Sequence, residues 1–269
     1  MTMKIGITGC AGRMGRMVAA AVAGTEDVKI AAGSEAANSP ALGHDIASLA
    51  GMPACGVQVV ADAAAVFRAS DAVIDFTTPA ALLVHARLAA ETGHALVVGT
   101  TGLGPEHEKA LGAAAKKTVI VRAANFSIGV NVILGLARDA ARILRDDYDI
   151  EILEMHHRGK VDAPSGTALA LGAAVAEGRQ VSLALKSVRA RDGATGPRKA
   201  GDIGFASLRG GDVIGDHTVV FAGEGERIEL GHRASSRAVF AQGAVRAARW
   251  TQARPPGLYS MRDVLGFSA

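Results

Sequence analysis

Short apolar runs rich in Val and Ile alternate with longer alanine-rich segments between Met3 and about Val121. This alternation is typical of parallel strands joined by crossover helices. The runs are apolar at almost every position, as expected for strands buried on both faces of a sheet. We therefore predict an α/β domain with a doubly wound parallel sheet. The predicted strands are Met3–Thr8, Val28–Ala32, Val57–Val60, Ala72–Phe76, Ala95–Val98 and Thr118–Arg122.

The pattern changes from about Glu151, where strand-like segments follow one another with few helical segments between them. This succession of strand-like segments predicts a second, smaller α+β domain with a mainly antiparallel or mixed sheet. One helix is predicted at Gly166–Glu177, and the glycine- and charge-rich stretch from Arg189 to Gly211 is typical of a long loop or lid. The predicted strands are Ile150–Met155, Val181–Arg189, Gly204–Ser207, Val213–Phe221 and Glu226–His232.

The amino-acid composition mainly excludes classes of protein. Of the 269 residues, 49% are hydrophobic and 20% are charged, as in ordinary globular proteins. The net charge of +3 is small and scattered, which disfavours a nucleic-acid partner. Two cysteines, Cys10 and Cys55, are too few for a disulfide framework, and no apolar run reaches the length of about 18 residues that a membrane span needs. We therefore expect a cytoplasmic protein without a membrane span.

The first predicted strand runs into a glycine-rich loop, and a helix is predicted after it at Arg16–Gly24. A strand, a glycine turn and a helix together allow backbone N–H groups to hold a pyrophosphate. The spacing is G-x-x-G-x-x-G rather than G-x-G-x-x-G, so an incidental tight turn is the alternative. We predict a Rossmann-like dinucleotide site. Its loop residues are Gly9, Cys10, Ala11, Gly12, Arg13 and Met14.

Glu35 follows the second predicted strand, near the offset of about 20 residues at which an acid binds the adenosine ribose. A carboxylate at this point can accept hydrogen bonds from both ribose hydroxyls, whereas the 2′-phosphate of NADPH needs a neighbouring cation. The neighbours Ser34 and Ala36 are uncharged, and Arg13 is the cation that could meet a phosphate. We predict NADH as the preferred cofactor, with NADPH as a second one. A solvated loop acid is the alternative interpretation of Glu35.

Two further turns follow predicted strands of the same sheet. Ligands of open α/β sheets bind beyond the carboxyl ends of the strands, and small residues there leave room for a nicotinamide ribose. Thr and Asn side chains can hydrogen-bond the nicotinamide amide. We predict that both turns belong to the cofactor site, although each alone could be an ordinary turn. Their residues are Gly99, Thr100, Thr101, Ala123, Ala124, Asn125 and Phe126.

The segment from Glu154 to Thr167 concentrates histidines and cations where a predicted strand ends and a Pro-Ser-Gly-Thr turn starts a helix. Histidine transfers protons near neutral pH, and lysine is a charged donor there. The free N–H groups of a helix start attract a carboxylate. The segment therefore suits an anionic substrate that must be protonated, with a basic exposed turn as the alternative.

Metal binding is not expected at this segment. His156 and His157 are adjacent in a predicted strand, so their side chains point to opposite faces. No carboxylate partner for either histidine is evident in the sequence.

Five segments, in this order, resemble the bacterial dihydrodipicolinate reductases, also called 4-hydroxy-tetrahydrodipicolinate reductases. The resemblance extends from the first strand to the end of the chain, and the HHRxKxDAPSGT run is highly specific. The segments are GCAGRMG at 9–15, GTTG at 99–102, AANFSIGVN at 123–131, E-x-HHRGKVDAPSGTA at 154–168 and GLYSMRDVLG at 257–266.

This resemblance implies an NAD(P)H-dependent reduction in diaminopimelate and lysine biosynthesis, acting on a cyclic dicarboxylic imine that arises from the 4-hydroxy compound by loss of water. It implies that His156 is a proton donor and acceptor and that Lys160 is a proton donor. His157, Gly166 and Thr167 would hold the substrate carboxylates. The resemblance also implies a homotetramer assembled through the sheet of the second domain. Some relatives have Arg directly after the ribose-binding acid, whereas this chain has Ala36, so equal use of both cofactors is not expected.

These observations predict two domains. Residues 1–127, completed by residues 238–269, would bind the dinucleotide, and residues 128–237 would bind the substrate and form the oligomer. Two other functions are weighed against the reductase. A dehydrogenase of aspartate or its semialdehyde would leave the HHRGK run unexplained, and a non-catalytic dinucleotide sensor would bind NADH without turnover.

Overall fold

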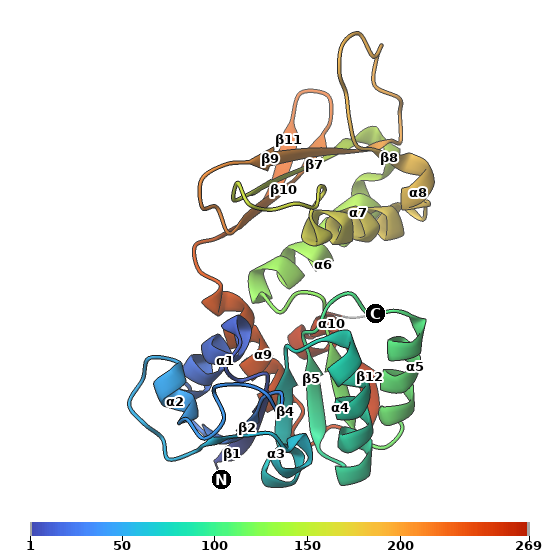
Figure 1. Ribbon diagram of the computed structural model, residues 1–269. Coiled ribbons are helices and arrows are strands. Elements are labelled where there is room, and N and C mark those ends of the chain that lie inside the picture. Colours follow the sequence, from blue (N-terminus) through green and yellow to red (C-terminus); the bar gives the residue numbers. More distant parts are fainter. Residues whose placement is uncertain (1, 268–269) are drawn as a thin grey trace. The chain divides into compact units, whose positions relative to one another are not determined.

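The computed structural model describes residues 2–267, and the chain divides into two compact units. Unit 1 contains the chain up to Ile128 and the chain from Ala238 onward, and unit 2 is Gly129–Arg237 (Figure 1). Unit 2 is therefore an insertion between two segments of unit 1. No helix within residues 2–267 has the length and apolar character that crossing a membrane requires.

Unit 1 contains a sheet that, within residues 2–267, has seven strands in the order β12-β6-β5-β4-β1-β2-β3, all paired in parallel. The predicted doubly wound parallel sheet is confirmed, and β12 is a strand that the apolar pattern did not predict. β3 is shorter than the predicted Val57–Val60. The strands are β1 Met3–Thr8, β2 Val28–Ser34, β3 Val59–Val60, β4 Ala72–Asp75, β5 Ala95–Val98, β6 Val119–Arg122 and β12 Gly257–Tyr259.

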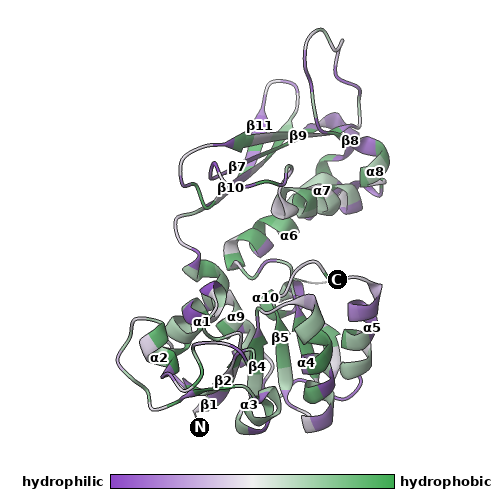
Figure 2. Ribbon diagram, viewed as in Figure 1, coloured by the Kyte–Doolittle hydropathy of each residue, from purple (hydrophilic) through white to green (hydrophobic). Residues whose placement is uncertain are grey.

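Helices cover both faces of this sheet, because successive side chains of each buried strand are apolar on both sides. On β1, Ile5 and Ile7 pack with α1 and α9, whereas Val73 of β4 packs on the other side with α3, α4 and α5. In Figure 2 the central strands β4 and β5 are coloured as hydrophobic. The helices are α1 Arg13–Ala23, α2 Ile46–Leu49, α3 Ala63–Ala69, α4 Pro79–Thr92, α5 Pro105–Ala114, α9 Ala238–Trp250 and α10 Met261–Leu265.

Unit 2 has one sheet, which within the described residues has five strands in the order β11-β10-β7-β9-β8. β10 pairs antiparallel with β7 and β11, whereas β9 pairs in parallel with β7 and β8, so the sheet is mixed. One face carries a core that includes Ile152, Phe205 and Phe221 and packs against α6 and α7. The elements are α6 Ile128–Leu144, a 3₁₀ turn Arg145–Asp147, β7 Asp149–His156, α7 Gly166–Arg179, α8 Leu183–Lys186, β8 Ser187–Val188, β9 Ile203–Arg209, β10 Gly215–Ala222 and β11 Arg227–Ala234.

The predicted strand Val181–Arg189 is wrong. It forms the short helix α8 followed by the two-residue strand β8. An alternating strand would bury Leu183 and Leu185 on one face, but Leu183 packs in the core of unit 2 while Leu185 is 85% exposed. The predicted loop from Arg189 to Gly211 also includes β9, so the irregular segment between strands is residues 189–202. Helix α6 was not predicted.

Candidate functional site

The glycine loop connects the end of β1 with the start of α1. Gly9 has a φ of 67°, in the left-handed region that favours glycine, and Gly12 is the N-cap of α1. The helix begins at Arg13, so the predicted start at Arg16 is wrong. Gly15 lies in the first turn, where a Cβ atom would be 2.1 Å from the carbonyl oxygen of Gly9, and glycine lets the turn approach the loop. Within the described residues the N–H groups of Arg13 and Met14 have no partner, so they can meet an anion.

Glu35 ties the end of β2 to the glycine loop. Its Oε1 accepts a hydrogen bond from the backbone N–H of Ala11 at 2.8 Å, and its own N–H donates to the carbonyl oxygen of Val60 at 3.0 Å. Oε2 of this half-buried carboxylate makes no hydrogen bond within residues 2–267, so it is available to accept one. The following residue, Ala36, is exposed. A carboxylate oxygen in this position is chemically suited to accept a ribose hydroxyl.

Cys10 contributes its backbone rather than its thiol. The side chain is fully buried in the core of unit 1, and its Sγ lies near Gly33. Burial, with a smaller contribution from the charge of Glu35, raises the pKa of the Cys10 thiol to about 12. The thiol is therefore neutral at physiological pH and is not a nucleophile.

A pocket of about 330 Å³ lies in unit 1, beyond the carboxyl ends of β4, β5 and β6. Gly99 forms part of its wall, and a Cβ atom there would lie 2.1 Å from the ring of Phe76, so only glycine fits. Phe76 in turn packs edge-to-face on Phe126, with ring centroids 5.8 Å apart. The lining residues predicted from the sequence are Met14, Gly99, Thr100, Thr101, Ala124, Asn125 and Phe126; Phe76, Thr77 and Phe240 complete the lining.

The residues of unit 1 therefore fit a dinucleotide. The glycine loop offers unpaired N–H groups for a pyrophosphate, Glu35 offers a free carboxylate oxygen for a ribose, and the pocket offers space beyond the strand ends. Several predicted residues do not line the pocket itself. These are Gly9, Cys10, Ala11, Gly12, Arg13, Glu35 and Ala123.

In unit 2, the last residues of β7 carry a buried carboxylate and an imidazole on one face of the strand. Glu154 and His156 are two residues apart, so their side chains point the same way, and His156 Nδ1 lies 2.5 Å from Glu154 Oε2. Arg209 donates to both carboxylate oxygens at 2.8 Å, and the N–H of Ser165 donates to Oε1 at 3.2 Å. Glu154 is therefore a fully paired buried anion.

These contacts determine the charge of Glu154. Burial by itself would raise the pKa of the carboxyl, but hydrogen bonds from Arg209, His156 and Ser207 outweigh it and lower the pKa to about 2. An ionised carboxylate only accepts hydrogen bonds, so the ring nitrogen facing it, His156 Nδ1, carries hydrogen. The other nitrogen, Nε2, makes no hydrogen bond within residues 2–267. A Cβ atom on Gly215 would lie 3.0 Å from Nε2, so glycine leaves space there.

A second buried histidine, His217, packs edge-to-face on His156 with ring centroids 5.1 Å apart. Burial, reinforced by the proximity of His156, lowers the pKa of His217 to about 4. Its Nε2 is 3.0 Å from the hydroxyl oxygen of Ser165, which also accepts the N–H of Ala168 as the N-cap of α7. The tautomer of His217 decides which group donates in this contact: with its hydrogen on Nδ1, the imidazole accepts the Ser165 hydroxyl hydrogen at Nε2.

The remaining predicted residues of unit 2 lie in the turn after β7 and at the start of α7. Lys160 Nζ donates to Asp162 Oδ1 at 2.6 Å, and the Lys160 ammonium lowers the pKa of Asp162. The N–H of His157 donates to the carbonyl of Val213 at 2.7 Å, which attaches this turn to the chain before β10. Gly166 and Thr167 are the first two residues of α7, and Gly166 is exposed with open space around its Cα.

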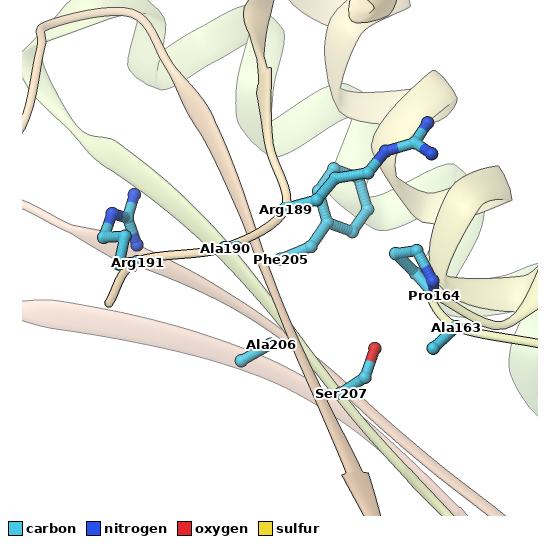
Figure 3. Close-up of a pocket in the computed structure, with 8 residues that line it drawn as sticks. All are labelled: Ala163, Pro164, Arg189, Ala190, Arg191, Phe205, Ala206 and Ser207. Atoms are coloured by element: carbon cyan, nitrogen blue, oxygen red, sulfur yellow. The ribbon is translucent and has the colours of Figure 1, made fainter. Parts of the chain in front are cut away.

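In unit 2, a pocket of about 390 Å³ borders this turn at Ala163 and Pro164 (Figure 3). Figure 3 shows the Ser207 hydroxyl pointing into the space between β9 and the Ala163–Pro164 turn. The guanidinium of Arg191 is already paired with both carboxylate oxygens of Glu151 at 2.8 Å. None of the predicted site residues lines this pocket.

The sequence interpretation missed Glu154, Arg209 and His217 as members of the site, and the statement that no carboxylate partner is evident is wrong. The sequence could have predicted the contact between Glu154 and His156, because residues i and i+2 of a strand lie on the same face. Arg209 and His217 have no local signal. The register of the sheet pairs Arg209 with His156 and His217 with Glu154. Within residues 2–267 no three His, Cys, Asp or Glu side chains are grouped to hold a metal ion.

Comparison with known proteins identifies the family. A model of the dihydrodipicolinate reductase N-terminus matches residues 3–126, and a model of the C-terminus matches residues 129–265. The chain belongs to the dihydrodipicolinate reductase family. A 4-hydroxy-tetrahydrodipicolinate reductase of Parvibaculum lavamentivorans is 56% identical over 265 residues, 98% of each chain, and one of Rhodopseudomonas palustris is 51% identical over 264 residues, 98% of this chain and 97% of the other.

Solved structures agree with the family. A dipicolinate-bound dihydrodipicolinate reductase from Paenisporosarcina sp. TG-14 superposes with a TM-score of 0.78 at 25% identity, covering 97% of this chain and 98% of that chain. An amine dehydrogenase from Mycobacterium smegmatis, at 17% identity and a TM-score of 0.60, shares the fold alone. The predicted resemblance and fold class are confirmed by the family match and by these structures.

The paired state of Glu154 predicts a specific pH dependence of stability. Folding lowers the pKa of this carboxyl from 4.5 to about 2, so its contribution is fully present above pH 4.5 and is lost as the pH falls towards 2. We expect the thermal midpoint of the wild type to fall more steeply across this window than that of Glu154→Gln, as measured by circular dichroism. Exposed Glu26, in Glu26→Gln, is the matched control and should keep the wild-type slope. An unchanged slope in Glu154→Gln would contradict the assigned ionisation.

Proposed function

We propose that this chain reduces 4-hydroxy-tetrahydrodipicolinate, by way of dihydrodipicolinate, to tetrahydrodipicolinate in diaminopimelate and lysine biosynthesis. The observation that carries the proposal is the buried Glu154–His156 pair, within a chain 56% identical over 98% of its length to a protein of that name. The family is one of pyridine nucleotide-dependent reductases, and this chain is an NAD(P)H-dependent oxidoreductase. A relative solved with dipicolinate, a ring dicarboxylate, supports the substrate class.

Unit 1 is the dinucleotide-binding domain in this proposal. The N–H groups at the start of α1 hold the pyrophosphate, and Glu35 Oε2 accepts from the adenosine ribose. The pocket beyond β4, β5 and β6 takes the nicotinamide end. When bound, the cofactor supplies a hydride. The holding residues are Gly9, Cys10, Ala11, Gly12, Arg13, Met14, Glu35, Gly99, Thr100, Thr101, Ala123, Ala124, Asn125 and Phe126.

Unit 2 binds the substrate and moves protons. His156 exchanges a proton at Nε2, because ionised Glu154 holds the Nδ1 hydrogen and stabilises the imidazolium that forms. Lys160 has three donor hydrogens, of which Asp162 takes one, so the ammonium can still donate to the ring or its carboxylate. His157 and the α7 residues Gly166 and Thr167 hold the substrate carboxylates, since a helix start favours anions.

Removing either proton-transfer group should lower turnover and spare cofactor binding. We expect His156→Ala and Lys160→Ala each to lose roughly 10²- to 10⁴-fold in kcat, the usual share of general acid–base catalysis. Turnover is measured as NADH oxidation on the freshly formed condensation product of pyruvate and aspartate semialdehyde, and NADH binding by fluorescence titration. Lys116→Ala, exposed in the turn after α5, is the control. Near-normal turnover in both variants would remove the assignment, and binding without turnover in the wild type would favour a dinucleotide sensor.

We propose NADH as the preferred cofactor, because the residue after the ribose-binding acid is Ala36 and carries no charge for a 2′-phosphate. The wild type should have the higher kcat/KM with NADH. Ala36→Arg should raise kcat/KM for NADPH about tenfold or more, the scale of one charge-assisted hydrogen bond. Ala37→Arg, one residue further along the same exposed turn, is the matched control. A higher wild-type kcat/KM with NADPH would refute the preference.

We also propose a homotetramer formed through the open face of the unit 2 sheet. Opposite the core face of this sheet, Leu153 and Leu208 are 39% and 53% exposed, and Ala206 lies beside them. We expect sedimentation analysis to give a tetramer for the wild type and smaller species for Leu153→Glu/Leu208→Glu, because charges on a buried interface are costly. Leu185→Glu, on the outer side of α8, should stay tetrameric. A monomeric wild type would contradict the proposal.

The cytoplasm is the compartment we propose for this reaction. Cys10 and Cys55 are both free, one buried and one exposed, as a reducing compartment keeps them. The small and scattered net charge gives no reason to expect a nucleic-acid partner.

A further inference from the structure

Asp75, the last residue of β4, is a buried carboxylate that the proposed chemistry does not use. It is 0% exposed, yet it makes hydrogen bonds through both oxygens. Oδ1 accepts from the N–H of Thr77 at 2.8 Å, from the Thr77 hydroxyl at 2.7 Å and from the Thr100 hydroxyl at 2.9 Å. Oδ2 lies 2.5 Å from Nδ1 of His85, a buried residue of α4.

These bonds keep Asp75 ionised. Burial by itself would raise the pKa of the carboxyl, but the hydrogen bond and charge of His85 and the hydrogen bonds from Thr77 lower it below its usual value. His85 Nδ1 must carry hydrogen, since it faces an oxygen that only accepts. Without His85, Oδ2 would be a buried anionic oxygen with no donor, which is a costly arrangement.

The ionised carboxylate fixes the direction of two hydroxyl groups. Thr77 and Thr100 each have one hydroxyl hydrogen, and Asp75 Oδ1 receives both. A hydroxyl oxygen has two lone pairs that still accept hydrogen bonds after its hydrogen is committed. Both threonines line the 330 Å³ pocket beyond β4, β5 and β6. Any ligand group at these hydroxyls must therefore be a donor.

We propose that Asp75 and His85 are positioning residues that hold the hydroxyls of Thr77 and Thr100 as acceptors for the carboxamide NH₂ of a nicotinamide. The inference rests on the proposed cofactor site. It adds that the Thr77 and Thr100 hydroxyls in the pocket wall act as hydrogen-bond acceptors. The carboxamide NH₂ is the donor on the nicotinamide ring itself. Oriented acceptors would fix the rotation of the amide and, through it, which face of the ring is presented.

The test compares NADH with reduced 3-acetylpyridine adenine dinucleotide, in which a methyl group replaces the amide NH₂. The wild type should bind the analogue about 3- to 10-fold more weakly than NADH in a fluorescence titration, the scale of one hydrogen bond. Thr77→Val and Thr100→Val should weaken the binding of NADH more than the binding of the analogue. The ratio of the two dissociation constants, which measures the discrimination, should then fall towards one. Thr92→Val removes a hydroxyl that donates to carbonyls of α4 and accepts the N–H of His94; it does not line the pocket, so this variant should keep the wild-type ratio.

Two substitutions of His85 test the positioning role. His85→Asn retains an N–H donor for Asp75 and should keep the discrimination, whereas His85→Leu removes the donor and should reduce it. Thermal midpoints are recorded alongside, and if His85→Leu does not fold, the threonine variants decide. Unchanged discrimination in folded Thr77→Val and Thr100→Val would overturn the inference while leaving the cofactor site intact. Failure of the wild type to bind NADH at all would instead overturn the proposed function.

Discussion

The buried carboxylate of Glu154 is the constraint on which unit 2 depends. An anion with no water around it is tolerated only if donors surround it, and here Arg209, His156 and the Ser165 N–H come from β9, β7 and the start of α7. These three elements must therefore keep their register for the anion to remain paired. The same bonds orient His156 and tie the turn that carries Lys160 and Asp162 to β9, because Arg209 also donates to the carbonyl of Asp162. The hydrogen bonds that stabilise the sheet around Glu154 are therefore the same ones that orient the His156 imidazole.

Unit 1 uses a comparable arrangement. Asp75 ends the central strand β4, and Glu154 lies two residues before the end of the central strand β7; each is buried and is paired with a histidine at 2.5 Å. In both cases a carboxylate that only accepts hydrogen bonds decides which atoms of its neighbours carry hydrogen. At Glu154 the consequence is a free Nε2 on His156, and at Asp75 it is two hydroxyls with their lone pairs outward. Burial raises the cost of leaving either oxygen unpaired, so it also makes these orientations specific.

Part of this arrangement could be predicted from the sequence, because it depends on local patterns. Strand, turn and spacing single out the glycine loop and Glu35, and the structure joins the two by a hydrogen bond; their role towards a cofactor stays a prediction. The site in unit 2 could be located but not completed, since Arg209 reaches Glu154 only through the parallel register of β7 and β9. Tertiary packing also overrode local alternation at Leu183 and Leu185. The three-residue strand β12 is too short for periodicity to register and exists because β6 offers it an edge.

The hydrogen bond between Glu35 and Ala11 fixes the position of a carboxylate that would repel a phosphate on a bound cofactor. Oε1 accepts the N–H of Ala11, so the carboxylate stays close to the start of α1 and its other oxygen can accept a further hydrogen bond. A 2′-phosphate at that ribose would bring a second negative charge against Glu35 in a half-buried setting, where repulsion is weakly screened. A cation at position 36 would relieve this repulsion, and Ala36 cannot. The Arg16 side chain donates to the carbonyl of Ala11 at 2.8 Å, and Arg13, the remaining cation of the loop, is exposed at the first residue of α1. The proposed preference for NADH therefore rests on the fixed position of one carboxylate rather than on the shape of the pocket.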